Sequence, residues 1–537
     1  MIGVVAPEQD MPVIREFFEL FKTPWEICRS SKHYDVVLAA STEGSLPDAD
    51  LSVVYGLDPE DRAREKDRDQ ARQAVLLRYR EHRFPVYSGC SVFTGGRKQV
   101  IYQEATRKVV GSEIPGSGRK IVRIGYDLIE EVRFLLSNGQ PTEYAHVPTL
   151  DIHISIFRDL IVESRIPLVE IPPVPAGFDM MLCLTHDVDF ASIRRHGIDR
   201  TVLGFLYRAT IVSFVHFLKG KLTLGRLLGN LLAAFSLPLV HLGLVQDFFN
   251  QFEKYLRLEG SIRSTFFVVP HKNLDGEELG DQRSKGRATR YDVADIRPQL
   301  SALVAKGREI GLHGIDAWND TDTAEAERER IQEAAHSAVT GVRSHWLFWS
   351  YRSPEVLEEA GFLYDSSFGY NETVGYRSGT CQVFQPLNAA KLLELPLHVQ
   401  DTALFSSGRM GLSQQDGIEK IEEVLRWIRQ GRGVITVNWH LRSIGPERQW
   451  DKAFQHLLQL ADDPRVWVAP AQDVVQWFAS RRLVNFSEID LEKGRIFKSS
   501  KGTETTPRIA VRWYNHHGTA TSEAEHVSLL ERSRTAG

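Results

Sequence analysis

The chain has 537 residues, enough for two or three domains, and its 42% apolar and 25% charged content is typical of a protein with a sizeable core. The net charge of -5 gives no reason to expect a nucleic-acid partner. The four cysteines are far apart in the sequence, which argues against a cysteine zinc ribbon and a disulfide framework. No basic stretch followed by a long apolar run opens the sequence, so we expect a cytoplasmic protein.

Residues 1–172 are predicted to form a smaller N-terminal α/β domain of unknown role. Apolar runs predict three strands and a helix, at 35–40, 51–55, 121–125 and 127–137. No combination of residues in this part suggests catalysis. The Pro- and Gly-rich segment 171–177 is a plausible domain boundary.

Residues 173–482 repeat a strand-then-helix pattern. Predicted strands lie at 180–186, 264–269, 307–313, 392–399, 433–440 and 466–471, with helices at 296–306 and 418–428. Near-continuous apolar strands that alternate with helices indicate a parallel sheet covered on both faces and closed as a barrel. In such barrels the catalytic groups lie where strands end.

A basic, apolar insertion is expected at 191–250. It carries seven Lys/Arg and one Asp up to residue 230, and 227–245 contains no charged residue. A helical cap packed on the barrel is the first interpretation. A surface helix that docks on anionic lipid is the alternative, and a re-entrant hairpin is a third. One membrane crossing is excluded, because Asp187 before the insertion and His313 after it must reach the same site.

Residues 483–537 are predicted to be a C-terminal appendage. A strand is expected at 508–514. The polar tail from about 516 is predicted to be disordered.

The most informative stretch is 182–189, where an apolar strand ends in two carboxylates, Asp187 and Asp189. Strand side chains alternate between faces, so these two acids point the same way. Two like charges so close together require a cation or a proton between them. His313 and His440 also end predicted strands. The pattern therefore predicts a metal-assisted hydrolytic site.

Segments in chain order resemble the polysaccharide deacetylases, carbohydrate esterase family 4, also called the NodB homology domain. Residues 185–189 resemble a variant first motif, and 264–268 the strand that follows it. Residues 309–313 resemble the approach to the second motif. Residues 341–346 and 359–367 resemble the third motif with its trailing strand, and 437–440 resemble the last motif. The resemblance covers roughly residues 178 to 482. It implies an irregular (β/α)7 barrel.

By chemistry and by this resemblance, one divalent metal ion, expected to be zinc, would be held by Asp189 and His313. Asp187 would be the general base and His440 the general acid. Arg343 would orient Asp187 through a two-pronged hydrogen bond.

The second motif of the family usually carries two histidines four residues apart, and here position 317 is Ala. The third metal ligand therefore has to come from another position. His345, Asp316 and Asn319 are the candidates, and we assign His345 to the metal.

Four residues are expected to contact substrate. Trp346 and Trp439 could stack on sugar rings, although core packing is the usual role of tryptophan. Arg377 could bind an anionic group or be a solvated loop residue. Asp401 follows a predicted strand and could contact substrate or orient His440.

The function expected from these residues is that of a metal-dependent hydrolase of carbon–nitrogen bonds other than peptide bonds. It would remove an acetyl group from an N-acetylated, or O-acetylated, sugar in polysaccharide metabolism. The alternative is a catalytically degenerate module that binds carbohydrate or scaffolds a biosynthetic complex. A third possibility is hydrolysis of an amide outside carbohydrates. Residues 191–250 would allow peripheral contact with the inner face of the membrane, where a lipid-linked or activated sugar would be met.

Overall fold

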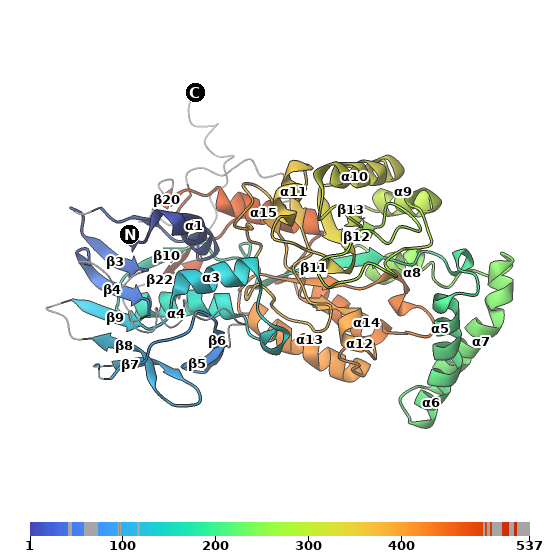
Figure 1. The fold of residues 1–537 in the computed structure, drawn as a ribbon, viewed down its shortest axis with the longest axis horizontal. Helices are drawn as coiled ribbons and strands as arrows, with labels where there is room; N and C mark the ends of the chain where they lie inside the picture. Colours follow the sequence, from blue (N-terminus) through green and yellow to red (C-terminus); the bar gives the residue numbers. More distant parts are fainter. Residues whose placement is uncertain are drawn as a thin grey trace.

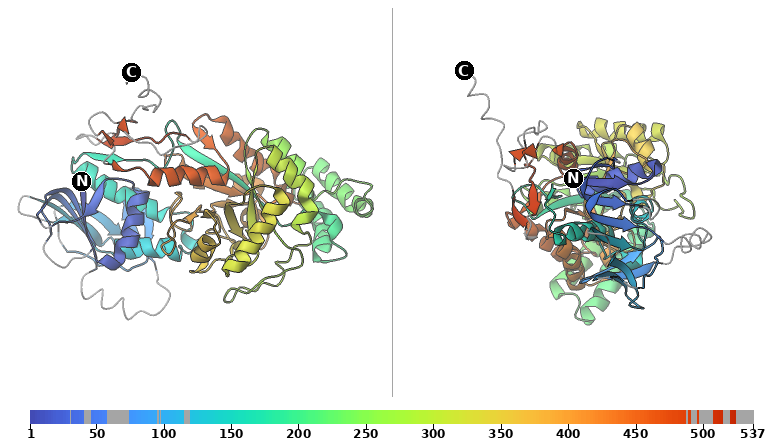
Figure 2. Two further views of the ribbon diagram at one scale, coloured as in Figure 1. Left: turned by 90° about the horizontal axis from the view of Figure 1, so that it is seen from above. Right: turned by 90° about the vertical axis from the view of Figure 1, so that its left-hand side faces the viewer.

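The computed structural model describes three parts that follow one another along the long axis: an N-terminal sheet, a barrel and a helical hairpin (Figures 1 and 2). The described residues are 1–29, 31–40, 46–57, 74–94, 96, 98–114, 119–486 and 507–514, with the backbone of 489–490, 495–496 and 520–523.

The N-terminal part is a nine-stranded sheet of order β2-β1-β3-β4-β9-β8-β7-β5-β6. Pairs from β2 to β9 are parallel, and pairs from β9 to β6 are antiparallel. The strands are β1 (Ile2–Val5), β2 (Trp25–Ile27), β3 (Tyr34–Ala39), β4 (Ala49–Tyr55), β5 (Val75–Tyr79), β6 (His82–Val86), β7 (Lys98–Gln103), β8 (Val109–Ile114) and β9 (Lys120–Ile124). The three strands expected here are thus present, each within two residues of its predicted limits.

In the described residues of this part, the sheet is accompanied by the helices α1 (Met11–Leu20), α3 (Leu128–Ser137) and α4 (Thr149–Glu163). The helix expected at 127–137 is α3, and Asp127 caps it by accepting hydrogen bonds from the backbone N–H groups of Ile129 and Glu130. Asp151, a buried residue of α4, forms the contact with the barrel described next.

The N-terminal part is joined to the barrel through a buried carboxylate of α4. Asp151 accepts hydrogen bonds from Thr380 Oγ1 at 2.6 Å, from the Cys381 backbone N–H at 3.1 Å and from Trp427 Nε1 at 3.2 Å. Gln140 Nε2 donates to the backbone oxygen of Tyr376 at 2.6 Å. Because buried polar groups are costly unless paired, these bonds fix how the two parts pack together.

The barrel sheet has the order β16-β15-β14-β13-β12-β11-β18-β17, with β19 also paired to β11, and every strand pair is parallel. The strands are β11 (Met180–Val188), β12 (Thr265–Val268), β13 (Glu309–Gly314), β14 (Gly341–Ser344), β15 (Tyr364–Asp365), β16 (Leu393–Glu394), β17 (Val399–Gln400), β18 (Val434–Asn438) and β19 (Val466–Val468). All nine residues of β11 are buried, as expected for a central parallel strand.

The strand expected at 392–399 is divided into β16 and β17, and this division closes the barrel. β16 pairs with β15 at one edge of the sheet, and β17 pairs with β18 at the other. One short segment therefore joins both edges and completes an irregular seven-membered ring. The predicted fold class, an α/β barrel of the NodB type preceded by a smaller α/β part, is confirmed.

Helices surround the barrel, as the alternating pattern predicted (Figure 1). The predicted helices at 296–306 and 418–428 correspond to α9 and α13. The helices are α8 (Phe252–Glu259), α9 (Arg297–Ala305), α10 (Thr321–Ala335), α11 (Ser353–Glu359), α12 (Asp401–Phe405), α13 (Gln414–Ile428), α14 (Asp451–Gln459) and α15 (Ala471–Arg482). Ala471, expected to end a strand, instead begins α15.

The insertion at 191–250 forms a helical hairpin that protrudes from the barrel (Figures 1 and 2). Its first helix runs from Arg200 to Leu218 and includes α5 (Arg200–Tyr207) and α6 (Ser213–Leu218), with a π turn between them. The second is α7 (Leu224–His241). Both are long and apolar enough to cross a membrane by length and composition.

The C-terminal segment returns to the N-terminal part. β22 (Arg512–Tyr514), within the strand expected at 508–514, pairs antiparallel with β10 (Leu168–Glu170) and with β23 (Ala520–Glu523). Four residues of the tail expected to be disordered thus form a strand, and the rest of that prediction lies outside the described residues. β20 (Ile489–Asp490) and β21 (Arg495–Ile496) form a separate antiparallel pair.

Candidate metal centre

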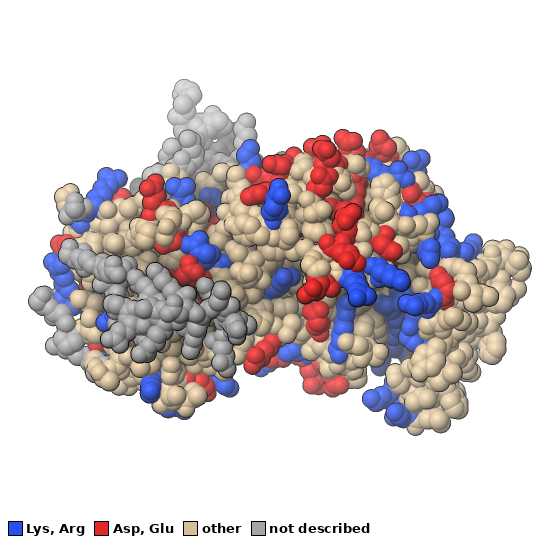
Figure 3. Space-filling model, viewed as in Figure 1, with Lys and Arg blue, Asp and Glu red and all other residues tan. Residues whose placement is uncertain are grey.

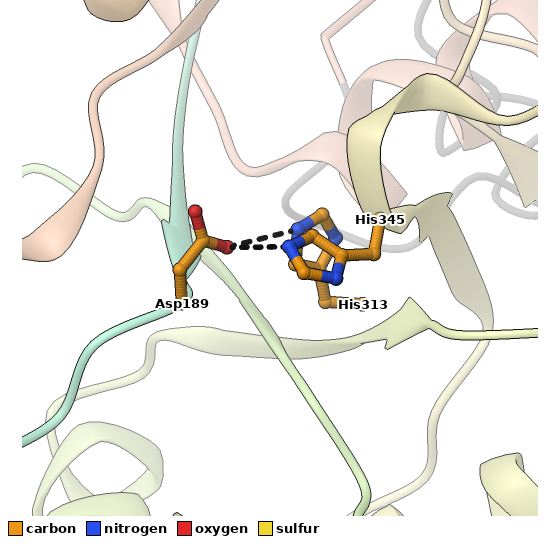
Figure 4. Close-up of side chains that lie close together, drawn as sticks. All are labelled: Asp189, His313 and His345. Carbon is orange, nitrogen blue, oxygen red and sulfur yellow. Dashed lines mark ion pairs between the residues drawn. The ribbon is translucent and has the colours of Figure 1, made fainter. Parts of the chain in front are cut away.

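Three side chains at the carboxyl edge of the barrel sheet face one another (Figure 4). Asp189 follows β11, His313 lies in β13 and His345 follows β14. His313 Nε2 is 3.2 Å and His345 Nε2 is 3.6 Å from Asp189 Oδ1. One ligand atom from each residue lies within 4.8 Å of the others. The ends of adjacent parallel strands meet at one edge, which explains how residues so distant in sequence come together.

The hydrogen bonds of this group leave its ligand atoms available to a cation. His313 Nδ1 lies 2.9 Å from the backbone oxygen of Arg343 and donates to it, which leaves Nε2 as the ring nitrogen that faces Asp189. Asp189 Oδ1 and His345 Nδ1 are buried and have no hydrogen-bond partner among the described residues. A carboxylate oxygen and two imidazole nitrogens fit a divalent metal ion.

The charge states also suit metal binding. Burial lowers the pKa of His345 to about 3, so this imidazole is neutral near pH 7, as a ligand must be. Burial alone would raise the pKa of Asp189, but His313 and His345 outweigh it and hold that pKa well below its ordinary range. The group therefore presents one ionised carboxylate and at least one neutral imidazole.

His345 takes the place of the histidine that is missing at position 317. Ala317 is buried. Asp316 is engaged elsewhere, because Oδ1 accepts from the backbone N–H of Glu277 at 2.9 Å and lies 3.7 Å from Arg287 Nη1. Of the three alternatives considered, the structure brings His345, and neither Asp316 nor Asn319, into the group.

A tight turn holds His345 in position. The next two residues, Trp346 and Leu347, both have left-handed backbone angles, with φ of 63° and 57°. Such angles are unusual for large side chains and persist only where the surroundings impose them. Here Asn371 Nδ2 donates to the Trp346 backbone oxygen at 2.7 Å, and Arg287 Nη2 donates to that of His345 at 3.3 Å.

Asp187 lies beside the metal group with both carboxylate oxygens held. Arg343 Nη1 donates to Oδ1 at 2.9 Å, and Asn438 Nδ2 donates to Oδ2 at 2.7 Å. His313 Nε2 is 3.7 Å from Oδ2. Burial would raise the pKa of Asp187, but Arg343 and His313 outweigh it and keep that pKa below its usual value. Asp187 is therefore ionised near neutral pH.

The expected two-pronged bond from Arg343 to Asp187 was wrong. One N–H of Arg343 reaches Asp187, and the remaining donors bind Thr185 Oγ1 at 2.7 Å, the Ser366 backbone oxygen at 3.0 Å and Ser366 Oγ at 2.9 Å. Asn438 supplies the second bond to Asp187. The sequence interpretation missed Asn438, although an amide that ends the apolar strand β18 was a signal for it.

His440 and Asp401 form a second polar pair at this edge. His440 Nδ1 donates to Asp401 Oδ1 at 2.6 Å, and its Nε2 lies 3.6 Å from Asp189 Oδ2. Burial would lower the pKa of His440, but the buried Asp401 carboxylate outweighs it and raises that pKa above its ordinary value. Of the two roles considered for Asp401, the structure places it as the residue that orients His440.

The other residues expected to contact substrate differ in how accessible they are at the site. Trp346 is 40% exposed next to His345. Trp439 is fully buried between Phe405 and Phe454, so it has no face to offer a sugar. The Arg377 guanidinium donates to the Gly369 backbone oxygen at 2.9 Å and lies on the Phe368 ring, so the structure does not bring it to the metal group.

No protein-family model matches the chain, and no curated protein matches it.

Solved structures are similar to more than half of the chain. A protein of the polysaccharide deacetylase type from Mycobacterium smegmatis is 18% identical, with a TM-score of 0.36, over 58% of this chain and 96% of the other. An allantoinase is 14% identical, with a TM-score of 0.35, over 58% and 94%. A carbohydrate esterase family 4 pseudoenzyme from Bacillus anthracis is 10% identical, with a TM-score of 0.27, over 55% and 65%. The solved structures similar to this chain thus include polysaccharide deacetylases and members of carbohydrate esterase family 4, which its motifs resemble.

Proposed function

We propose that the protein is a metal-dependent hydrolase that removes an acetyl group from an N-acetylated, or less favourably an O-acetylated, sugar in polysaccharide metabolism. One observation carries this proposal. A group able to hold a metal lies between an ionised carboxylate, Asp187, and a histidine, His440, that is oriented by a buried carboxylate. Hydrolysis of an amide needs a base, an electrophile and an acid on one small site.

Asp189, His313 and His345 would hold the ion, and zinc is the ion that we propose. Zinc commonly takes three protein ligands of this kind in catalytic sites and leaves a position open. When bound, such an ion lowers the pKa of water and polarises a carbonyl oxygen.

Asp187 would act as the general base. It would take a proton from the attacking water as the water oxygen bonds to the acetyl carbonyl carbon. Arg343 and Asn438 each bind one of its oxygens, so its orientation is fixed before substrate arrives. The remaining lone pairs of the carboxylate are available to accept the proton.

His440 would act as the general acid. Cleavage of the carbon–nitrogen bond leaves the sugar nitrogen with an electron pair that needs a proton, and acetate departs as the other product. Asp401 holds the ring through Nδ1, which leaves Nε2 directed to the metal group and able to donate. The exposed ring of Trp346 supports a sugar substrate, because aromatic rings stack on the apolar faces of sugars.

Acetate release tests this function directly. Purified protein should contain about one divalent ion per chain and should release acetate from N-acetylated oligosaccharides. Removal of the ion by a chelator should abolish release, and added zinc should restore it. A protein that holds zinc but releases no acetate from any N- or O-acetylated sugar would contradict the proposal. A panel of amides without sugar would detect the alternative of hydrolysis outside carbohydrates.

The second candidate is a degenerate module that binds carbohydrate without catalysis. The reason to consider this candidate is the missing histidine at position 317. Because His345 lies in one group with Asp189 and His313, that reason is weaker. Sugar binding without acetate release, in protein loaded with zinc, would favour this candidate.

A further inference from the structure

The two helices of the hairpin each carry a row of large, exposed apolar side chains. On the first helix these are Leu203, Tyr207, Ile211, Phe214 and Leu218, and on α7 they are Leu224, Leu228, Leu232, Phe235 and Leu239. Their spacing of three or four residues puts them on one side of each helix. Leu232 is 70% and Phe235 is 77% exposed, so these stripes are open to their surroundings.

The hairpin does not need these stripes for its own folding. Val202, Phe205, Ala209, Ala233 and Leu237 form a separate small core between the two helices. Within it, Asn230 Nδ2 donates to Ser213 Oγ at 2.8 Å. The exposed side chains lie on the other side of each helix, which implies a partner outside the hairpin.

The charged residues of the two hairpin helices and the turn between them are all basic. No acidic residue occurs between 200 and 246. Lys219 and Lys221 are exposed at the turn between the helices. In Figure 3 the hairpin is a largely uncharged surface with basic residues at its lower end. Its surface therefore combines a wide apolar area with positive charge.

The barrel lies along the side of the hairpin. Arg226 Nη2 lies 2.9 Å from Asp451 Oδ1, and Arg208 pairs with Glu447. Asn230 Oδ1 accepts from the Glu447 backbone N–H at 2.9 Å. These contacts reach from the middle of the first helix to the start of α7. A hairpin that crossed a bilayer would carry these polar barrel loops into hydrocarbon, so an in-plane position is the one compatible with the structure.

We propose that the hairpin docks in the plane of an anionic phospholipid bilayer. The two apolar stripes would enter the boundary between headgroups and acyl chains, and Lys219 and Lys221 would lie among the phosphates. A protein partner would have to supply an apolar surface of similar extent that is acidic as well. A second copy of the chain would instead bring two basic turns together, so charge complementarity favours anionic lipid.

The docking side is also the side of the candidate active site. The hairpin follows Asp189 in the chain, and it rests on residues 447–451, which follow His440. Docking would therefore bring the open edge of the barrel to the bilayer surface. On the basis of the proposed function, the substrate would be an acetylated sugar presented at a membrane, such as a lipid-linked saccharide.

Vesicle flotation tests the docking. The wild-type protein should float with vesicles of phosphatidylcholine and phosphatidylglycerol, and less with phosphatidylcholine alone. The double variant Leu232→Ser with Phe235→Ser should lower the partition coefficient by about 100-fold or more, because two large apolar side chains lose their burial in lipid. Lys219→Glu with Lys221→Glu should lower it by about tenfold or more, with the anionic vesicles only.

The matched control is Leu363→Ser with Leu483→Ser, two exposed leucines outside the hairpin, which should float like the wild type. Thermal melting of each variant checks that it is folded. Wild-type protein that stays in solution with anionic vesicles at low salt overturns the proposal, as does a folded Leu232/Phe235 variant that still floats. A hairpin-dependent dimer without vesicle binding would assign the surface to a second copy and overturn it too.

Flotation and acetate release distinguish a failure of the docking proposal from a failure of the proposed function. Asp187→Asn should float like the wild type, because the base takes no part in lipid contact. Acetate release from an acetylated lipid-linked sugar in vesicles should exceed release from the soluble sugar. The Leu232/Phe235 variant should lose that excess and keep its activity on the soluble sugar. Normal flotation without any acetate release would reject the proposed function and leave docking intact.

Discussion

Two pairs of carboxyl groups in the same barrel differ in charge state, because both acids of one pair are ionised and the acids of the other pair share a proton. Asp187 and Asp189 are close to Arg343 and to three histidines, and the pKa of each lies below its usual value. Asp365 and Glu394 are register partners on β15 and β16. Burial and mutual repulsion raise the pKa of Glu394 well above its ordinary value, and burial raises that of Asp365 to about 6.

The two faces of one sheet account for this difference. Arg343 bonds to Ser366, which follows Asp365, and strand alternation turns Asp365 to the opposite face. On the face of Arg343 the nearby cations outweigh burial, whereas on the other face burial and mutual repulsion outweigh the effect of Arg377 on Glu394, and the two acids share a proton. Burial of acids therefore does not make a metal site. Imidazole ligands and a fixed cation on the same face do.

The largest effect is expected from Asp187→Asn. Loss of the general base should lower kcat for acetate release by roughly 10²–10⁴-fold. The metal content should stay near that of the wild type, because Asp187 is not one of the three grouped ligands. Rates and metal analysis on the same preparation measure both. Wild-type rates in this variant would remove Asp187 from the mechanism.

His345→Gln should weaken zinc binding by more than about 100-fold, because loss of a ligand exceeds the 10–100-fold cost of losing an outer partner. Competition with a chromogenic chelator measures the affinity. Asp316→Asn is the matched control and should bind zinc like the wild type, since Asp316 bonds outside the group. An equal loss of zinc affinity in both variants would show that the loss is not specific to His345.

Asp401→Asn should lower kcat on N-acetylated sugars by about 10²-fold, the lower end of what a general acid contributes. The reason is loss of the bond that orients His440. An activated aryl acetate has a leaving group that needs no proton, so its hydrolysis should be nearly unaffected. An equal loss with both substrates would mean that Asp401 acts through folding and not through His440.

The smallest effect is expected on the thermal stability of the protein, through the acid pair Asp365 and Glu394. The folded-state pKa of Glu394 is raised, so unfolded chains lose this proton first as pH rises. Stability from the shared proton is complete below about pH 4 and is lost as pH rises through the folded-state values, which begin at about 6 for Asp365. Glu394→Gln keeps a donor without a charge, so its Tm should exceed that of the wild type at pH 8 by on the order of 2 °C.

Thermal melting from pH 4 to pH 8 measures this difference, with Glu355→Gln on the exposed surface of α11 as the control. The gain should shrink toward pH 4, where the wild-type pair is fully protonated. A gain that is the same at every pH would show that the two acids do not share a proton.

Much of the fold could be predicted from the sequence because burial leaves a direct mark on parallel strands. β11, β13 and β18 are fully buried strands with an Asp, His or Asn at or next to their carboxyl ends, and their positions were predicted to within two residues. The pair of carboxylates one residue apart likewise required a cation nearby, whatever the partners.

Only the tertiary structure decided which residues lie around the carboxylates of Asp187 and Asp189. His345 lies beside His313 because β13 and β14 are neighbours in the sheet, and Asn438 reaches Asp187 because β18 pairs with β11. Trp439 and Arg377 were misplaced because their surroundings come from distant segments. The exposed stripes of the hairpin were equally undecided, since an apolar helix has the same sequence whether protein or lipid covers it.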